Sequence, residues 1–176
     1  MLRPRDTLLP AVFLVATLVA PPMAAASPDD ADEMHVFGWI ETVSLDGGTF
    51  QLEAKLDTGA DNSSLHATDI EEFERDDAEW VRFTTADRDD QEQEFERPVE
   101  RTASIRRTEG DPEERPVVKM DLCIGNVERE VEVNLTDRSA LSYPMLIGRS
   151  YLRDHILVDS GPKNTVEPDC SDSDTE

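Results

Sequence analysis

The sequence is poor in the groups on which several common chemistries depend. It contains two cysteines and three histidines, and its 17 lysines and arginines face 40 aspartates and glutamates, a net charge of −23. It has neither a Gly-rich phosphate loop with Lys nor a His-Glu-x-x-His pair, so no ATP site and no helical zinc site is indicated. Such an excess of negative charge repels nucleic acid and anionic membranes and suits high ionic strength. We therefore expect no cofactor, no metal and no nucleic-acid partner.

The few side chains that could bind a transition metal are scattered along the chain. They are His35, His66, Cys123, His155 and Cys170. None of them forms the close pair that is typical of a zinc site. His66 alone follows the acidic loop described below closely enough to bind a metal or a substrate, and a structural histidine with satisfied hydrogen bonds is the simpler interpretation.

The first 26 residues have the composition of a secretory signal. Arg3 and Arg5 precede an apolar run over residues 8–19, and the small residues 24–26 offer a cleavage site. An uncleaved anchor is the alternative, but the run is shorter than the roughly 20 residues that span a bilayer. The sequence thus predicts a periplasmic or secreted protein that is not inserted in a membrane after cleavage.

Acidic segments flank the predicted domain on both sides. Residues 27–34 form an acidic leader, residues 35–161 the domain, and residues 162–176 an acidic tail without periodicity, which is typical of disorder. Cys170 lies in this tail. A disulfide with Cys123 is possible in an exported protein, but the expected disorder of the tail argues against it.

Residues 54–67 are the stretch of the sequence that indicates acid–base chemistry. An apolar run ending at Leu56 predicts a buried strand that leads Asp57 into a Thr-Gly turn. Such a carboxylate is paired, hydrogen-bonded or used in a reaction, because an isolated buried carboxylate is strongly disfavoured. Thr58 can lock the loop with its hydroxyl, and Gly59 leaves room for a substrate backbone. An ordinary turn is the alternative for this tripeptide alone.

A second segment far downstream extends the pattern. Residues 144–152, Pro-Met-Leu-Ile-Gly-Arg-Ser-Tyr-Leu, place two apolar residues and a glycine before a short predicted helix. Together with residues 56–61, Leu-Asp-Thr-Gly-Ala-Asp, this segment resembles the two signatures of the retroviral-type aspartic peptidases, the retropepsins. The similarity is closer to a bacterial branch labelled ATP-dependent zinc protease or RimK-associated retropepsin-like peptidase. Its marks are residues 38–41, 54–67, 80–83, 114–118, 135–138 and 146–149.

The resemblance implies roles for individual residues. Asp57 is the catalytic residue, Thr58 grips the opposite loop and Gly59 contacts the substrate backbone. The implied substrate-binding residues are Ala60, Asp61 and Gly110, and the implied structural support of the site comes from Leu146, Ile147, Gly148 and Arg149. Asp61 and Arg149 are expected to form an ion pair, although each could be an exposed charge of little consequence.

The resemblance also implies a flap that covers the substrate and excludes water. Residues 106–115 around Gly110 occupy the expected place in chain order. Residues 113–115 within this stretch are either ordinary turn residues or binding residues.

An aspartic peptidase needs two carboxylates that share one proton, because two carboxylates about 3 Å apart cannot both ionise. The Asp159-Ser160-Gly161 sequence offers a second acid, yet too few residues surround it to build a second lobe, so a turn is expected there. A two-fold homodimer supplies the second acid as another copy of Asp57, as the resemblance implies. We therefore expect a homodimer that acts on a peptide or protein substrate.

These observations favour an aspartic endopeptidase that hydrolyses peptide or isopeptide bonds. A non-catalytic module that binds peptides beside an envelope-associated peptide-modifying system is the first alternative, and a metal hydrolase is the second.

Short strands separated by glycine turns predict an all-β protein, a retropepsin-like closed β-barrel with one short helix after Gly148, near the C-terminus. The expected strands are residues 36–43, 49–56, 63–67, 80–84, 97–106, 115–123, 127–135 and 156–158. Residues 68–77 are expected to form a charged connection with one helical turn, and residues 86–96 an exposed loop or the tip of a hairpin.

Overall fold

The structure is a computed structural model that describes residues 34–48, 50–106 and 111–170. In chain order its elements are β1 (His35–Gly38), β2 (Ile40–Leu45), β3 (Gln51–Leu56), β4 (Ser63–His66), β5 (Thr68–Arg75), β6 (Ala78–Ala86), β7 (Glu92–Pro98), β8 (Arg101–Ile105), β9 (Glu113–Ile124), β10 (Val127–Thr136), β11 (Met145–Ile147), α1 (Arg149–Leu152) and β12 (Ile156–Asp159). The predicted signal peptide, and the acidic leader apart from Met34, lie outside the described residues.

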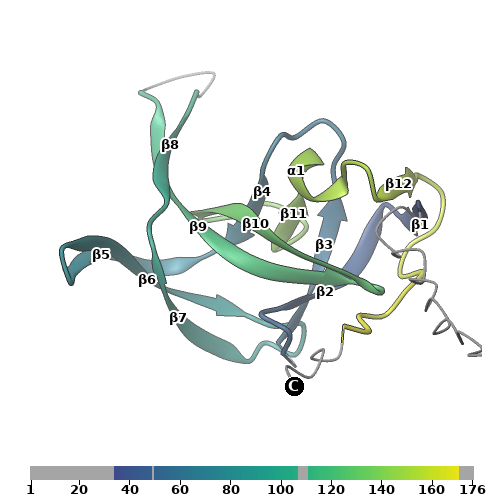
Figure 1. The fold of residues 1–176 in the computed structure, drawn as a ribbon, viewed down its shortest axis with the longest axis horizontal. Helices are drawn as coiled ribbons and strands as arrows, with labels where there is room; N and C mark the ends of the chain where they lie inside the picture. Colours follow the sequence, from purple (N-terminus) through teal and green to yellow (C-terminus); the bar gives the residue numbers. More distant parts are fainter. Residues whose placement is uncertain (1–33, 49, 107–110, 171–176) are drawn as a thin grey trace, which may run out of the picture. The chain divides into compact units, whose positions relative to one another are not determined.

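Six strands close into a barrel, shown in Figure 1. Their order is β10-β4-β11-β3-β2-β9, and β9 pairs back with β10 to close the ring. Side chains alternate across the barrel wall, as in β3, where Leu52, Ala54 and Leu56 are buried and the residues between them are not. The predicted all-β barrel with one short C-terminal helix is therefore confirmed. Strands β2 and β3 pair antiparallel, with Ile40 opposite Lys55.

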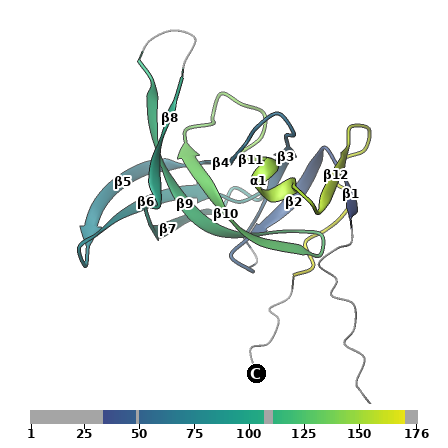
Figure 2. The same ribbon diagram turned by 45° about the horizontal axis from the view of Figure 1, so that its top comes forward.

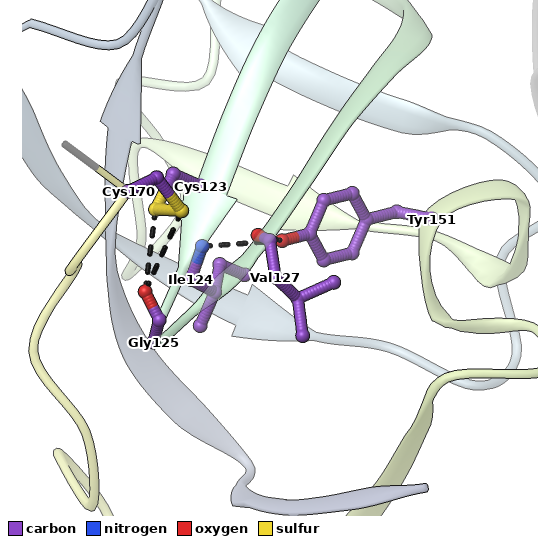
Figure 3. The surroundings of a disulfide bond; sticks show 6 residues. All are labelled: Cys123, Ile124, Gly125, Val127, Tyr151 and Cys170. Carbon is purple, nitrogen blue, oxygen red and sulfur yellow. Dashed lines mark hydrogen bonds between the residues drawn. A yellow bond between two sulfur atoms is a disulfide. The ribbon is translucent and has the colours of Figure 1, made fainter. Parts of the chain in front are cut away.

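The helix α1 follows Gly148 as predicted and is held to the turn between β9 and β10. The buried Tyr151 hydroxyl donates to the Val127 carbonyl at 2.7 Å and accepts the Ile124 N–H at 3.1 Å (Figure 3). Burial of the hydroxyl raises the pKa of Tyr151. Within the described residues, no helix has both the length and the apolar character that a bilayer crossing requires.

A second sheet, in the order β5-β6-β7, extends away from the barrel (Figures 1 and 2). The prediction of a connection with a helical turn over residues 68–77 is wrong, because most of these residues form strand β5. Residues from Glu71 to Arg75 pair in register with β6, and the Arg75 guanidinium packs over the rings of Phe73 and Trp80. Pairing with a neighbouring strand thus overrides the local signal of a charged run. Residues 86–96 contain the tip of a hairpin, as one of the two predictions for them had it, but the tip is shorter, because β6 ends at Ala86 and β7 begins at Glu92.

Residues 162–170 differ from the predicted disordered tail. They contain no helix or strand, yet they are tied to the barrel. The buried carboxylate of Glu41 accepts the backbone N–H groups of Thr165 at 2.8 Å and Val166 at 3.2 Å. A buried carboxylate requires such donors, and the chain after β12 supplies them.

The disulfide that the sequence disfavoured is present. Cys123 at the end of β9 is bonded to Cys170, with their Cα atoms 6.1 Å apart, and Figure 3 shows the bond beside Gly125. The N–H of Asp169 donates to the Gly125 carbonyl at 2.7 Å. Residues 162–170, called the C-terminal strap below, are therefore part of the folded unit, whereas residues 171–176 lie outside the described residues.

Candidate active site

Strand β3 carries Asp57 to the end of the barrel wall. The Leu56 N–H donates to the Trp39 carbonyl at 3.0 Å, and the Asp57 N–H donates to the Ile147 carbonyl at 2.8 Å. The backbone at Leu56 and Asp57 is therefore hydrogen-bonded to two different segments, and this fixes the position at which the following loop begins.

The Asp57 carboxylate has donors in its own chain. The Gly59 N–H donates to Oδ1 at 2.9 Å and the Lys55 ammonium donates to Oδ2 at 3.2 Å. The Gly59 N–H lowers the pKa of Asp57 most, burial opposes it, and Lys55 lowers the pKa further. The side chain is 27% exposed. In a single chain, Asp57 is thus ionised at neutral pH and can accept a proton but has none to donate.

The second signature lies directly against the Asp57 loop. Strand β11 runs parallel to β3, with Ile147 opposite Leu56, and antiparallel to β4. At its end Gly148 approaches the loop so closely that a Cβ atom there would lie 2.5 Å from the carbonyl carbon and oxygen of Asn62. The Gly148 N–H donates to the Ser63 hydroxyl at 3.2 Å. Leu146, Ile147 and Gly148 therefore lie where the resemblance places them.

Arg149 binds the Asp57 loop from the same side. Its guanidinium pairs with the Asp61 carboxylate and donates to the Thr58 carbonyl at 3.0 Å. Its backbone N–H donates to the Ala60 carbonyl at 2.9 Å. The expected ion pair between Asp61 and Arg149 is thus confirmed, and it links the two signatures within one chain.

Two paired strands border the predicted flap of residues 106–115, of which residues 107–110 lie outside the described residues. β8 pairs antiparallel with β9, from Arg101 opposite Val117 to Ile105 opposite Glu113, and Figures 1 and 2 show the two strands projecting from the barrel. Gly110 lies outside the described residues, so its substrate-binding role stays a prediction.

Arg138 lies near the loop and was not predicted as a site residue, whereas Arg115 was predicted as either a turn residue or a binding residue. Arg138 is only 8% exposed, although arginine side chains are almost never fully buried unless they are paired. Its Nε donates to the Tyr143 carbonyl at 3.3 Å, and in the part of the chain that the structure describes no acceptor lies within hydrogen-bonding distance of its two terminal nitrogens. Burial lowers the pKa of Arg138, Arg115 lowers it further, and the negative charge of Asp57 raises it.

Arg115 on β9 adds a second cation to this region. Its guanidinium donates to Glu113 at 3.0 Å and to the Asn134 side chain at 3.3 Å. The only sequence signal for these arginines was their position in the family marks at residues 114–118 and 135–138. Lys55 binds Asp57, Arg138 interacts electrostatically with Asp57, and Arg115 lies near Arg138, so positive charge gathers on this side of a protein whose net charge is strongly negative.

The remaining candidates take structural positions. His66 accepts the Arg138 N–H on Nδ1 at 2.9 Å, which agrees with the simpler interpretation of this histidine. Asp159 ends β12 and accepts the Gly161 N–H at 2.9 Å, so the Asp-Ser-Gly sequence forms the expected turn. Across residues 34–48, 50–106 and 111–170, no three His, Cys, Asp or Glu residues form a group that could hold a metal ion.

Comparison with known proteins matches residues 36–168 to a family described as RimB-like, retropepsin-like aspartic endopeptidase RimB. Among solved structures, a protein of unknown function from Legionella pneumophila superposes with a TM-score of 0.65 and is 34% identical. The superposition covers 75% of this chain and 98% of that one.

Curated relatives carry a different name. A probable alpha-L-glutamate ligase from Parasynechococcus marenigrum is 36% identical over 128 residues, which cover 70% of this chain and 28% of the relative. One from Desulfotalea psychrophila is 33% identical over 111 residues, which cover 61% of this chain and 24% of the relative. The chain thus spans about a quarter of the length of these relatives.

Proposed function

Since this chain belongs to the RimB-like family of retropepsin-like aspartic endopeptidases, we propose that it is an aspartic endopeptidase that hydrolyses peptide or isopeptide bonds. The observation that carries the proposal is the Asp57 loop. A partly exposed carboxylate at the end of β3 accepts the Gly59 N–H and is supported by the second signature through Gly148 and Arg149.

The reaction requires a second copy of the chain. Asp57 of one subunit accepts a proton from water, and the water oxygen attacks the carbonyl carbon of the substrate. Asp57 of the other subunit, which holds the shared proton, donates it to the carbonyl oxygen. The proton taken from water then passes to the amide nitrogen, the C–N bond breaks and the amine leaves. Two carboxylates in contact raise the pKa of one of them, which offsets the lowering by Gly59 and Lys55 in the single chain. A homodimer therefore supplies both the acid and the base.

The cations around Asp57 suggest what the substrate carries. Arg138 is nearly buried and keeps two terminal nitrogens without an acceptor among the described residues, and Arg115 and Lys55 lie in the same region. A guanidinium of this kind binds a carboxylate well, because its paired donors match the two carboxylate oxygens. We therefore propose a peptide or protein substrate with carboxylate groups next to the scissile bond.

A second candidate function follows from the curated relatives. They are named as glutamate ligases, and the part that resembles this chain is about a quarter of their length. A retropepsin-like module that binds peptides without cutting them, beside a peptide-modifying enzyme, would bind its peptide at the same loop. The signal-like residues 1–26 and the disulfide between Cys123 and Cys170 support action in the periplasm or outside the cell.

Asp57→Asn tests the proposal. It keeps an acceptor for the Gly59 N–H but cannot share a proton, so cleavage of acidic peptides, followed by mass spectrometry, should fall by about 10²–10⁴-fold. Asp159→Asn is the matched control, because Asp159 accepts a glycine N–H two residues later in the same way, and it should retain activity. Peptide binding by the wild type without cleavage would favour the binding module. Inhibition by chelators but not by a statine-type inhibitor would contradict the aspartic mechanism.

A further inference from the structure

The C-terminal strap binds the backbone at the end of β1. The buried Glu41 carboxylate accepts the Thr165 N–H of the strap at 2.8 Å and the Gly38 N–H of β1 at 2.6 Å. The Pro162 carbonyl of the strap lies so close that a Cβ atom on Gly38 would be 2.6 Å from its oxygen. One carboxylate thus joins the strap to β1, and loss of the strap would leave this buried group without part of its donors.

These contacts continue to the proposed catalytic residue. Trp39 donates its N–H to the Pro162 carbonyl of the strap at 3.3 Å, and its own carbonyl accepts the Leu56 N–H at 3.0 Å. Leu56 directly precedes Asp57 in the chain. Trp39 is therefore hydrogen-bonded to the strap on one side and to the strand that carries Asp57 on the other.

A second set of contacts connects the strap with Arg138. The Lys163 ammonium lies 4.4 Å from the centre of the Trp39 ring and donates to the Tyr143 hydroxyl at 3.3 Å. The rings of Trp39 and Tyr143 themselves meet edge to face. The Tyr143 carbonyl accepts the Arg138 Nε–H at 3.3 Å. Lys163 of the strap thus contacts both the residue that supports the Asp57 strand and the loop that carries Arg138.

The disulfide holds the far end of the strap, and a dithiol can open it. Cys123 is 1% exposed, whereas Cys170 is partly exposed, so an attacking thiolate bonds to the Cys170 sulfur and Cys123 leaves as a thiolate. The second thiolate of the dithiol then displaces Cys170. The dithiol is oxidised to a disulfide, its two electrons reduce the cysteine pair, and its two protons end on the two cysteine thiols.

Resting on the proposed function, we infer that the C-terminal strap positions Asp57 and Arg138, and that the Cys123–Cys170 disulfide makes peptide cleavage depend on the thiol–disulfide state of the surroundings. In the oxidised chain the strap keeps both site residues in place. A protein dithiol or a small dithiol releases the strap, the contacts of Trp39 loosen, and cleavage falls. The peptidase is therefore silent in a reducing compartment and becomes active where disulfides form.

The test compares oxidised and dithiothreitol-reduced protein in a Trp80→Phe background, in which Trp39 is the sole tryptophan. Reduction should shift the Trp39 emission to longer wavelength, because water reaches the released ring. It should also lower kcat/KM for an acidic peptide by about 10²-fold, since a small misplacement of site residues has an effect of this size. Reoxidation should restore both. The double variant Cys123→Ser, Cys170→Ser is the control: it should stay at the reduced level with and without dithiothreitol. Circular dichroism checks that the barrel stays folded.

Lys163→Gln tests the connection to Arg138 with the disulfide intact. It removes the ammonium from Trp39 and Tyr143 but keeps the backbone hydrogen bonds of the strap, so KM for an acidic peptide should rise about 2–5-fold with kcat unchanged. Lys163→Arg should restore KM, because a guanidinium also stacks on aromatic rings. Lys119→Gln is the matched control, because the Lys119 ammonium is exposed and pairs with Glu130 instead, and it should change neither constant.

The outcomes separate the inference from the proposed function. A reduced protein that shows the emission shift, stays folded and cleaves at the full rate would overturn the inference and leave the peptidase proposal intact. Two titratable thiols without an emission shift would also overturn it, because the strap would then be held without the disulfide. An emission shift in a protein that cleaves no acidic peptide even when oxidised would refute the proposed function and still support release of the strap. Should reduction unfold the barrel, an unchanged KM in Lys163→Gln would overturn the positioning role.

Discussion

Gly148 is the residue at which the second signature approaches the Asp57 loop most closely. A Cβ atom there would lie 2.5 Å from backbone atoms of Asn62. The Asn62 backbone can move away only if the whole Asp57 loop moves with it. The sequence indicated Gly148 only as part of a signature. The physical reason for the glycine is the contact with Asn62, more than 80 residues earlier in the chain, and this contact exists only after the barrel closes.

Gly148→Ala should therefore disturb both stability and the Asp57 loop. We expect the free energy of unfolding in urea to fall by about 1–3 kcal/mol, as in other overpacked sites, together with a loss of peptide cleavage. Gly48→Ala is the control, because a Cβ atom at the exposed Gly48 would make only an ordinary contact, 3.4 Å from the Leu45 carbonyl oxygen. Equal effects of the two substitutions would contradict the role assigned to the close approach.

At the scale of elements, β5 and the C-terminal strap are two segments for which the local sequence pattern gave a wrong prediction. Both segments are acidic, and their apolar residues do not recur at a regular spacing. The local pattern therefore predicts a connecting segment for β5 and a disordered tail for the strap. β5 becomes a strand because β6 offers an edge to pair with. The strap becomes ordered because Glu41, buried on β2, accepts its backbone N–H groups. In both cases the partner is a different part of the chain.

Cys170→Ser should loosen the strap and destabilise the barrel. The disulfide links residues 47 positions apart, and a bond that closes a loop of this size contributes roughly 4 kcal/mol in the chain-entropy account. Denaturant unfolding should show such a loss for Cys170→Ser, and a reductant should destabilise the wild type but not the variant. If the variant unfolded at the wild-type midpoint, the hydrogen bonds of Thr165 and Val166 alone would suffice to hold the strap.

At the scale of the whole molecule, the excess of acidic residues governs how the protein responds to salt. The described ion pairs, such as Lys119 with Glu130 and Arg101 with Glu132, are mostly exposed and contribute little each. Repulsion among the remaining carboxylates acts over the whole surface and opposes the compact state. Screening this repulsion stabilises the fold more than it weakens the few attractive pairs.

Raising NaCl from about 0.1 M to about 1 M should therefore increase the stability of the protein. A gain of about 1 kcal/mol would raise Tm by ~2–4 °C for a chain of this size. The measurement is thermal unfolding of the wild type at two protein concentrations, because a Tm that does not change with protein concentration excludes a contribution from association. KCl should act like NaCl, because screening depends on ionic strength. A fall in Tm would indicate that attractive ion pairs dominate instead.

The sequence by itself determined the alternating strands of the barrel, the turn that carries Asp57 and the identity of the second signature, because these depend on side-chain periodicity and on residues close together in the chain. Only the tertiary structure decided the partners: Gly148 against Asn62, Glu41 with the strap, Cys123 with Cys170, and Arg138 buried near Asp57. These contacts join residues that are far apart in sequence, and a local pattern carries no information on which distant segments closure of the barrel brings together.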